Sequence, residues 1–578
     1  MTRPKIIIVG GGLSGLMTAL KAVEQGAEVA IFSTVPVRRS HSVCAEGGIN
    51  AALNTKGQDD SVSQHIYDTI YGGDFLAHQS PVEKMCKAAP AIIHMFDRMG
   101  VCFSRTNEGF IDQRLFGGVS KKRTCYGGAT TGQQLMAALD EQVRRSEVAG
   151  DIVKFENWEF GSLVLNDEGV CVGITAIDKV TLKVRGFAAD AVVICSGGYG
   201  EVFGAATSSK HCTGSAAMQV YKQGATFANP EFIQIHPTTI PGYDKMRLVT
   251  EGVRGDGGRI WVLRDGKPWY FLEEWYPEYG NLVPRDIASR AIWKVVNEMN
   301  LGVGGSKSVY LDITHLSKDL LKDNLAAVVD TYLKFVGEDP REVPMQVYPA
   351  VHYTMGGLWV DDNHQTTIQG VFAAGECDFQ YHGANRLGGN SLLSAVYSGM
   401  IAGVSAANYV TGKEVASDMS VINFVETECG MQEAFNKKIM LMNGNENPHK
   451  LKNELSECLN NSAFILRYDN QLKDADQKIL QLKERFQNAA MLDKIGFANQ
   501  ELFFMRTLFH QFDLAQLIVR AALNREESRG AHFKPEKPNR DDKKWLNVTK
   551  VSYNENEPEF DYKEKVEIEK IKPVERKY

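Results

Sequence analysis

The stretch KIIIVGGGLSG, residues 5–15, decides the fold of this 578-residue chain. Ile6–Val9 is a continuous apolar run that predicts a buried strand, and the glycines after it open an apolar helix that ends near Gln25. A second predicted strand, Glu28–Phe32, completes a strand–helix–strand unit. A GxGxxG turn in such a unit brings helix amides to a pyrophosphate. We therefore expect a Rossmann-like dinucleotide site that includes Gly10, Gly12, Leu13, Ser14 and Gly15.

The end of the second strand departs from the usual dinucleotide pattern. An acidic residue normally stands there to bind the ribose of NAD. In this chain the position falls on Ser33, whereas Glu28 lies too early in the strand. Ser33 still offers a hydroxyl to the ligand, but the interpretation as an NAD site loses support.

Two more strands run into glycine-rich turns much later in the chain. One is AVVICSGGYG at residues 191–200, and the other is GVFAAGE at residues 370–376, followed by HGANRLGGNSL at 382–392. A helix predicted from Leu392 to Tyr409 would direct its N-terminus toward a phosphate or the edge of a flavin ring. These elements add further expected cofactor contacts: Ser196, Gly197, Gly198, Glu376, Asn390, Ser391 and Leu392.

The spread of these elements from residue 10 to residue 392 predicts one flavin-type α/β domain, residues 1–245 and 352–420, interrupted by an insertion. The insertion, residues 246–351, mixes expected strands (259–264, 308–312) with expected helices (285–299, 317–336). Apolar residues then recur at helical spacing, which predicts a helical domain over 421–528. The last segment, 529–578, is rich in charge, with a short strand expected at Lys565–Glu569.

Composition excludes several classes of protein. A net charge of −7 provides no basic surface for nucleic acid. No apolar run reaches membrane-spanning length, and the first strand begins too early to leave room for a signal peptide. None of the ten cysteines forms a CxxC pair, so no metal site is predicted. We expect a cytosolic chain, or one held at a membrane by other subunits.

The segment RRSHSVCAEGG, residues 38–48, places one histidine between two serines and ahead of a glycine pair. It resembles the signature R-[ST]-H-[ST]-x-x-A-x-G-G of the succinate dehydrogenase and fumarate reductase flavoprotein subunits, and matches every specified position. The resemblance implies FAD bonded covalently through its 8α carbon to His41, a bond that raises the flavin potential. It also implies flavin contacts from Ser40, Ser42, Ala45, Gly47 and Gly48.

The resemblance extends through nearly the whole chain and implies a capping domain over 246–351 and a dicarboxylate site. Its expected substrate-binding residues are His236, Thr250, Glu251, His352 and Arg386, and its expected proton-transfer residues are Arg285, Glu251 and Arg254. The chemistry fits, because a four-carbon diacid needs donors at each end and guanidinium groups bind carboxylates in a bidentate fork. Roles for Arg290 and His382 stay open. Structural roles are expected for His94, His211, His315 and His364.

Three features distinguish this chain within the resemblance. Glu46 stands where many relatives carry glutamine, and Ser215 stands where some carry aspartate at the ribose. Together with the segment Trp269–Glu274, they suggest the branch that uses menaquinone through a single dihaem cytochrome b.

The resemblance implies succinate oxidation on covalent FAD, with electrons passed to an iron–sulfur subunit, because this chain lacks cysteine spacing for clusters. A cytochrome b anchor would then hold the assembly at the cytoplasmic face of the membrane. The alternatives are a fumarate reductase subunit, an L-aspartate oxidase (disfavoured by His41) and a flavin scaffold without substrate chemistry. A scaffold would not need the dicarboxylate set, which is present in full.

Overall fold

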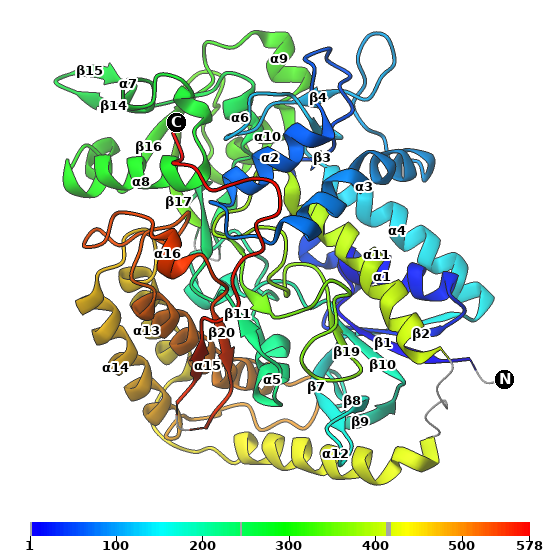
Figure 1. Ribbon diagram of the computed structural model, residues 1–578. Helices are drawn as coiled ribbons and strands as arrows, with labels where there is room; N and C mark the ends of the chain where they lie inside the picture. Colours follow the sequence, from blue (N-terminus) through cyan, green and yellow to red (C-terminus); the bar gives the residue numbers. More distant parts are fainter. Residues whose placement is uncertain (1–2, 243–244, 412–417, 556, 578) are drawn as a thin grey trace.

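The computed structural model describes residues 3–242, 245–411, 418–555 and 557–577 (Figure 1). The predicted opening is confirmed: strand β1 (Lys5–Val9), helix α1 (Leu13–Glu24) and strand β2 (Glu28–Ser33) form a parallel unit. Ile6 and Ile8 on one face of β1 and Ile7 on the other are all buried, as expected for a strand covered on both faces.

The three glycine-rich elements meet in one parallel sheet of order β19-β10-β1-β2-β6. Strand β10 (Ala191–Ile194) pairs with β1, β19 (Val371–Ala373) pairs with β10, and β6 (Ile152–Glu156) closes the other edge. Helix α11 (Asn390–Val410) crosses α1 closely, because side chains at Gly399 and Gly403 would collide with backbone oxygens of α1 at 2.5 Å. The carboxyl ends of β1, β10 and β19 therefore open toward one place.

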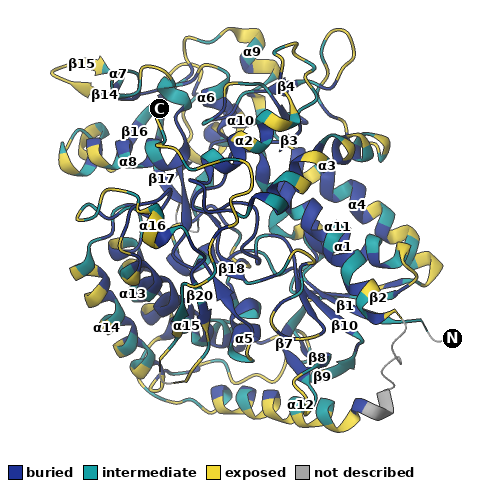
Figure 2. Ribbon diagram, in the orientation of Figure 1, coloured by how far each residue is buried: buried dark blue, intermediate teal, exposed yellow. Residues whose placement is uncertain are grey.

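Further helices and small sheets surround this unit. They are α2 (Val62–Gly72), α3 (Gln79–Arg98), α4 (Thr131–Ala149), α5 (Ser215–Lys222), the sheet β3 (Ile49–Asn50), β5 (Thr124–Cys125) and β4 (Gln113–Arg114), and the sheet β7 (Trp158–Leu165), β8 (Cys171–Asp178) and β9 (Val184–Ala188). Helices α2, α3 and α4 each have exposed and buried residues, whereas the short strands β3, β4 and β5 are buried throughout (Figure 2).

A second sheet, antiparallel at every strand pair, has the order β13-β12-β17-β16-β14-β15. Its strands are β12 (Ile233–Ile240), β13 (Arg247–Leu248), β14 (Arg259–Arg264), β15 (Lys267–Trp269), β16 (Val309–Asp312) and β17 (Met345–Thr354). Because β12 precedes residue 246 and pairs with β17, this sheet draws on both sides of the predicted domain boundary. The boundaries at 245 and 352 stay a prediction.

The helices of the inserted region differ in detail from the expected ones. The segment expected as one helix over 285–299 is α8 (Arg285–Trp293) followed by a π-helical turn, Lys294–Glu298. The segment expected over 317–336 is two helices, α9 (Lys318–Asp323) and α10 (Ala326–Val336), because the backbone of Leu325, with φ of −115° and ψ of 5°, departs from helical geometry between them. The short helices α6 (Gly252–Gly255) and α7 (Phe271–Trp275) complete the region.

The predicted helical segment is confirmed and contains α12 (Asp418–Met440), α13 (Pro448–Ser462), α14 (Asp469–Phe486) and α15 (Gln500–Asn524). Leu455, Ile479 and Leu508 pack into the core shared with the flavin-type sheet. Helix α12 lies along the β7–β9 sheet (Figure 1), and Arg506 of α15 joins it through hydrogen bonds to Asn436 and Gln432. No helix in the described part of the chain is long and apolar enough to cross a bilayer.

The expected strand at Lys565–Glu569 is wrong. Only an isolated bridge joins Lys565 to Asn547, because Val566 alone is buried there while its charged neighbours face outward. The strands of this region are β20 (Lys550–Ser552) and β21 (Glu559–Asp561), which join β11 (Phe227–Ala228) and β18 (Gly357–Leu358), and a short helix, α16 (Asp542–Trp545), precedes them.

Candidate active site

A cavity of about 1100 Å³ lies where the carboxyl ends of the parallel strands meet the second sheet. The glycine turn after β1, the segment around His41 and the start of α11 line one side, and residues of the inserted region line the other. Drug-sized ligands occupy cavities of about 300–1,000 Å³. This space therefore suits a ligand as large as a dinucleotide with a small substrate beside it.

The part of the cavity next to β1 has the features of a pyrophosphate site. Gly10 has φ of +120°, and a Cβ there would lie 2.1 Å from the carbonyl oxygen of Cys195, so the turn requires glycine. Helices α1 and α11 both begin on glycines, Gly12 and Gly389, without a side-chain cap. The Ser196 hydroxyl is buried and has no partner in the described part of the chain. Uncapped helix N-termini and an unpaired hydroxyl fit the diphosphate of FAD.

Most of the expected cofactor residues line this cavity: Gly10, Gly12, Leu13, Ser14, Ser33, Ser40, His41, Ser42, Ala45, Gly47, Gly48, Ser196, Gly197, Glu376, Ser391 and Leu392. Three others do not. A Cβ at Gly15 would meet Gly10 O at 1.9 Å, and one at Gly198 would meet Glu376 Oε1 at 2.3 Å, so both glycines serve packing. Asn390 is fully buried and bonds Asn50 and Thr69, which holds the start of α11 in place.

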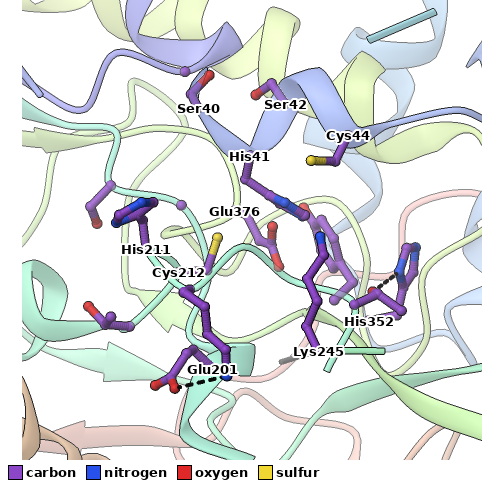
Figure 3. A pocket seen from close by; sticks show the side chains of 18 of the residues that line it. Ser40, His41, Ser42, Cys44, Glu201, His211, Cys212, Lys245, His352 and Glu376 are labelled. Carbon is purple, nitrogen blue, oxygen red and sulfur yellow. Dashed lines mark hydrogen bonds and ion pairs between the residues drawn. The ribbon is translucent and has the colours of Figure 1, made fainter. Parts of the chain in front are cut away.

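His41 stands in a 3-10 turn and reaches into the cavity, as Figure 3 shows. The backbone N–H of Ser209 donates to its Nδ1 at 3.2 Å. Burial, and then the nearby Lys245 ammonium, lower the pKa of His41 to about 4, so the imidazole is neutral at physiological pH. An imidazole whose Nδ1 accepts a hydrogen bond carries its hydrogen, or a carbon substituent, on Nε2.

Glu46 and its neighbours add charge beside His41. Arg114 donates from Nε to the Gly47 carbonyl oxygen at 3.0 Å and stacks on the Tyr126 ring, which fixes the loop. Burial raises the pKa of Glu46 to about 7 in spite of the opposing charges of Arg114 and Lys245. Lys245 and Ser209 were not predicted from the sequence, because neither belongs to a glycine turn or a matched motif.

We expect Glu46→Gln to stabilise the chain at alkaline pH. The folded chain holds the Glu46 proton between pH about 4.5 and 7, where the unfolded chain releases it, so stability falls as pH rises through this window. The variant has no proton to release here, so it avoids this loss in the free energy of unfolding, which is at most about 3 kcal/mol. Urea unfolding at pH 5 and pH 8 measures it, with the exposed Glu141→Gln as control. An equal stability difference at both pH values would contradict the titration of Glu46.

A buried ionic cluster lies at the other end of the cavity. The Arg285 guanidinium donates from Nε at 3.0 Å and from Nη2 at 2.7 Å to one oxygen of Glu251, Oε2, and Arg254 Nη2 donates to the other oxygen, Oε1, at 2.9 Å. Burial alone would raise the pKa of Glu251, but the two guanidinium groups lower it below its usual value. Glu251 is therefore a carboxylate that holds Arg285 against the cavity, with Arg254 behind it and outside the lining.

Two histidines and an arginine complete this end. His236 and His352 lie edge to face with ring centroids 5.0 Å apart. His236 Nδ1 lies 3.1 Å from the backbone oxygen and 3.3 Å from the backbone nitrogen of Thr238. The Thr207 hydroxyl lies 2.7 Å from His352 Nδ1. Burial and the nearby Arg285 lower the pKa of both rings well below the usual value, so both are neutral.

Arg386 packs its guanidinium over the Tyr353 ring at 4.4 Å, and its buried Nε has no partner among the described residues. Burial and the charge of Arg285 lower its pKa to about 9. With Thr250 also in the lining, the expected substrate residues His236, Thr250, Glu251, His352 and Arg386 share one end of the cavity. Neutral imidazoles and buried guanidinium groups together provide a site for a small dianion.

The two residues whose roles were left open, His382 and Arg290, have contacts outside the cavity. His382 is buried outside the lining, 2.9 Å from the Ser394 hydroxyl, and Arg290 donates to Asp286 and to the Gly530 carbonyl oxygen.

Other residues near the site differ in how far they were predicted. His364, expected to be structural, bonds the Tyr381 hydroxyl in the core. His211, expected to be structural, is exposed but lines the cavity. Gln234, which accepts from Arg285 Nη1 at 3.0 Å, was missed although it stands only two residues before the expected His236.

Comparison with known proteins gives the same class of protein. A family model described as an FAD binding domain matches residues 5–392, and one described as the fumarate reductase flavoprotein C-terminus matches 452–578. The chain thus belongs to the flavoprotein subunits of succinate dehydrogenases and fumarate reductases, which are FAD-dependent oxidoreductases.

Individual relatives show how similar the chain is to members of each kind in this family. It is 51% identical to the succinate dehydrogenase flavoprotein subunit of Bacillus subtilis, over 100% of this chain and 99% of the relative. It is 34% identical to the fumarate reductase flavoprotein subunit of Haemophilus influenzae, over 99% and 96%. A solved quinol-fumarate reductase with menaquinol molecules is similar with a TM-score of 0.91 and 30% identity, over 99% of this chain and 100% of that one. The predicted family and fold class are confirmed: an α/β flavoprotein with a Rossmann-like FAD-binding domain, a capping domain, a helical domain and a C-terminal domain.

Proposed function

We propose that this chain oxidises succinate to fumarate as the flavoprotein subunit of a succinate:quinone oxidoreductase. The observation that carries the proposal is the meeting, in one cavity, of His41 with the cluster of Arg285, Glu251 and Arg386. The 51% identity over the full chain to a succinate dehydrogenase subunit supports this direction.

The cluster suits binding and proton transfer. Arg386 would hold one carboxylate of the diacid, and the neutral His236 and His352 would donate to the other. Arg285, held by Glu251 on one side and Gln234 on the other, would take the proton that leaves the carbon chain as it gives one of its own protons to the Glu251 carboxylate, because a charged guanidinium has no site for an extra proton. Glu251 and Arg254 would then pass this proton on, because their side chains are in direct contact with each other and with Arg285.

The residues around His41 would hold FAD, which supplies the two-electron acceptor when bound. The Ser209 N–H on Nδ1 of His41 supports a covalent bond from Nε2 to the 8α carbon, because that hydrogen bond leaves Nε2 for the substituent. Gly47 lines the same part of the cavity and would help to hold FAD, and a Cβ there would meet the Phe116 ring at 2.9 Å.

We propose that electrons leave toward an iron–sulfur subunit and a cytochrome b anchor, with this chain peripheral on the cytoplasmic face of the membrane. Similar chains come from a quinol-fumarate reductase and from a Mycobacterium smegmatis Sdh1 complex, the latter 30% identical with a TM-score of 0.81. Menaquinone and a single dihaem cytochrome stay a prediction.

Fumarate reduction is the alternative, since the same groups serve both directions. The test is the ratio of succinate oxidation to fumarate reduction in the intact membrane complex. A ratio well above one supports the proposal, and a ratio well below one favours fumarate reductase. A complex with bound flavin and neither activity would indicate a flavin scaffold.

A further inference from the structure

The segment 570–577 does not line the cavity, but its contacts lead to Arg285. It runs beside α2 and ends next to α8 (Figure 1). Gln79 holds Ile571 through two hydrogen bonds, and the Tyr71 hydroxyl and Lys577 backbone bond each other at 2.7 and 3.1 Å. Both anchors, Gln79 and Tyr71, belong to helices of the FAD-binding region.

Between these anchors Arg576 reaches the inserted region. Its Nη2 donates to Asp286 Oδ2 at 2.7 Å, and its Nη1 lies 3.6 Å from Asp74 Oδ2. The side chains of Arg576, Asp286 and Asp74 are 8%, 1% and 10% exposed, so these charges interact with little screening. Asp74 is itself fixed by Arg540 Nη1 at 2.7 Å and by the Gly530 N–H at 2.8 Å. Arg576 thus links a rigid part of the FAD-binding region to the first turn of α8.

A continuous chain of hydrogen bonds then runs from Asp286 to the reacting end of the cavity. Asn385 Nδ2 donates to Asp286 Oδ1 at 3.1 Å, and Asn385 Oδ1 accepts from Gln234 Nε2 at 2.9 Å. Gln234 Oε1 accepts from Arg285 Nη1 at 3.0 Å. Asn385 and Gln234 are 3% and 0% exposed, so each amide is held in one orientation.

We propose that Arg576 is a positioning residue for proton transfer by Arg285. It fixes Asp286, which orients Asn385 and Gln234, and it ties α8, which carries Arg285, to the FAD-binding region. Without it Asp286 keeps Arg290 as a partner, so the fold survives while the Arg285 guanidinium gains freedom. This inference rests on the proposed function, because it concerns the rate of the succinate reaction.

The test compares Arg576→Met with Arg576→Lys in the purified complex, with Lys572→Met, an exposed cation of the same segment, as matched control. We expect Arg576→Met to keep its covalent flavin and a KM for succinate within about twofold. Its kcat per flavin should fall about tenfold, since a small misplacement of a reacting group has effects of this order or larger. The solvent deuterium isotope effect on kcat should rise, and Arg576→Lys should restore part of the rate. In an Asp286→Asn background, Arg576→Met should add little further loss.

An unchanged kcat per flavin in Arg576→Met, or an equal fall in Lys572→Met, would overturn the inference. So would a loss of rate that only follows a loss of flavin in both Arg576 variants, since that is a general structural effect. A wild-type complex that fails to oxidise succinate would instead overturn the proposed function.

Discussion

His41→Ser should yield a folded chain that binds FAD without a covalent bond and has lost succinate oxidation. His41 has the ring nitrogen and the neutral state that the bond needs, and no other histidine lies in the matched segment 38–48. The potential should fall without the bond, and for a two-electron couple each ~30 mV lowers the equilibrium constant for succinate oxidation tenfold. We therefore expect succinate oxidation to fall at least about 100-fold, and fumarate reduction to fall less.

The measurement is in-gel flavin fluorescence of the denatured chain, followed by both assays on the same preparation. His211→Ser is the matched control, because His211 also lines the cavity but stands outside the motif. It should keep a fluorescent band. A fluorescent band in His41→Ser would show that the flavin is bonded elsewhere.

Arg285→Ala should keep the flavin and lose turnover. The guanidinium is buried and bonded to Glu251 and Gln234, and its removal takes away the group placed to accept the proton. General acid–base catalysis contributes about 10²–10⁴-fold, so kcat should fall by about three orders of magnitude. Arg285→Lys should recover little, because an ammonium cannot reproduce the planar set of donors that reaches both Glu251 Oε2 and Gln234 Oε1.

Succinate–dye turnover per flavin measures this loss, with the exposed Lys294→Met, just after α8, as control. The control should stay within about twofold of the unaltered chain. More than a tenth of the original kcat in Arg285→Ala would remove Arg285 from proton transfer.

Local sequence patterns predicted the elements whose causes are local. The apolar run before Gly10 and the glycine spacing dictate β1, the turn and α1, because the turn has no room for a Cβ at Gly10 or Gly15. The amphipathic spacing of α14 and α15 was equally clear. The strand expected at Lys565–Glu569 failed because alternation of charged and apolar residues cannot show whether a neighbouring strand exists.

The candidate site likewise contains residues that the sequence predicted and residues that only the structure reveals. Expected site residues such as His236 and Arg386 line the cavity, but Gly198 and Asn390, expected as cofactor contacts from the glycine-rich turns, pack the structure around it. Lys245 and Arg576 carry no local signal, since their roles depend on contacts with residues about 200 and 290 positions away. Charges that meet only in the folded chain require the structure.

The most direct test of the central claim is anaerobic addition of succinate to the purified complex, without dye, while flavin absorbance and fumarate are followed. If one tethered flavin faces a dicarboxylate site, the absorbance should bleach and about one fumarate should form per flavin before electrons pass on. A complex that carries covalent flavin, keeps its full absorbance and forms no fumarate would contradict the account.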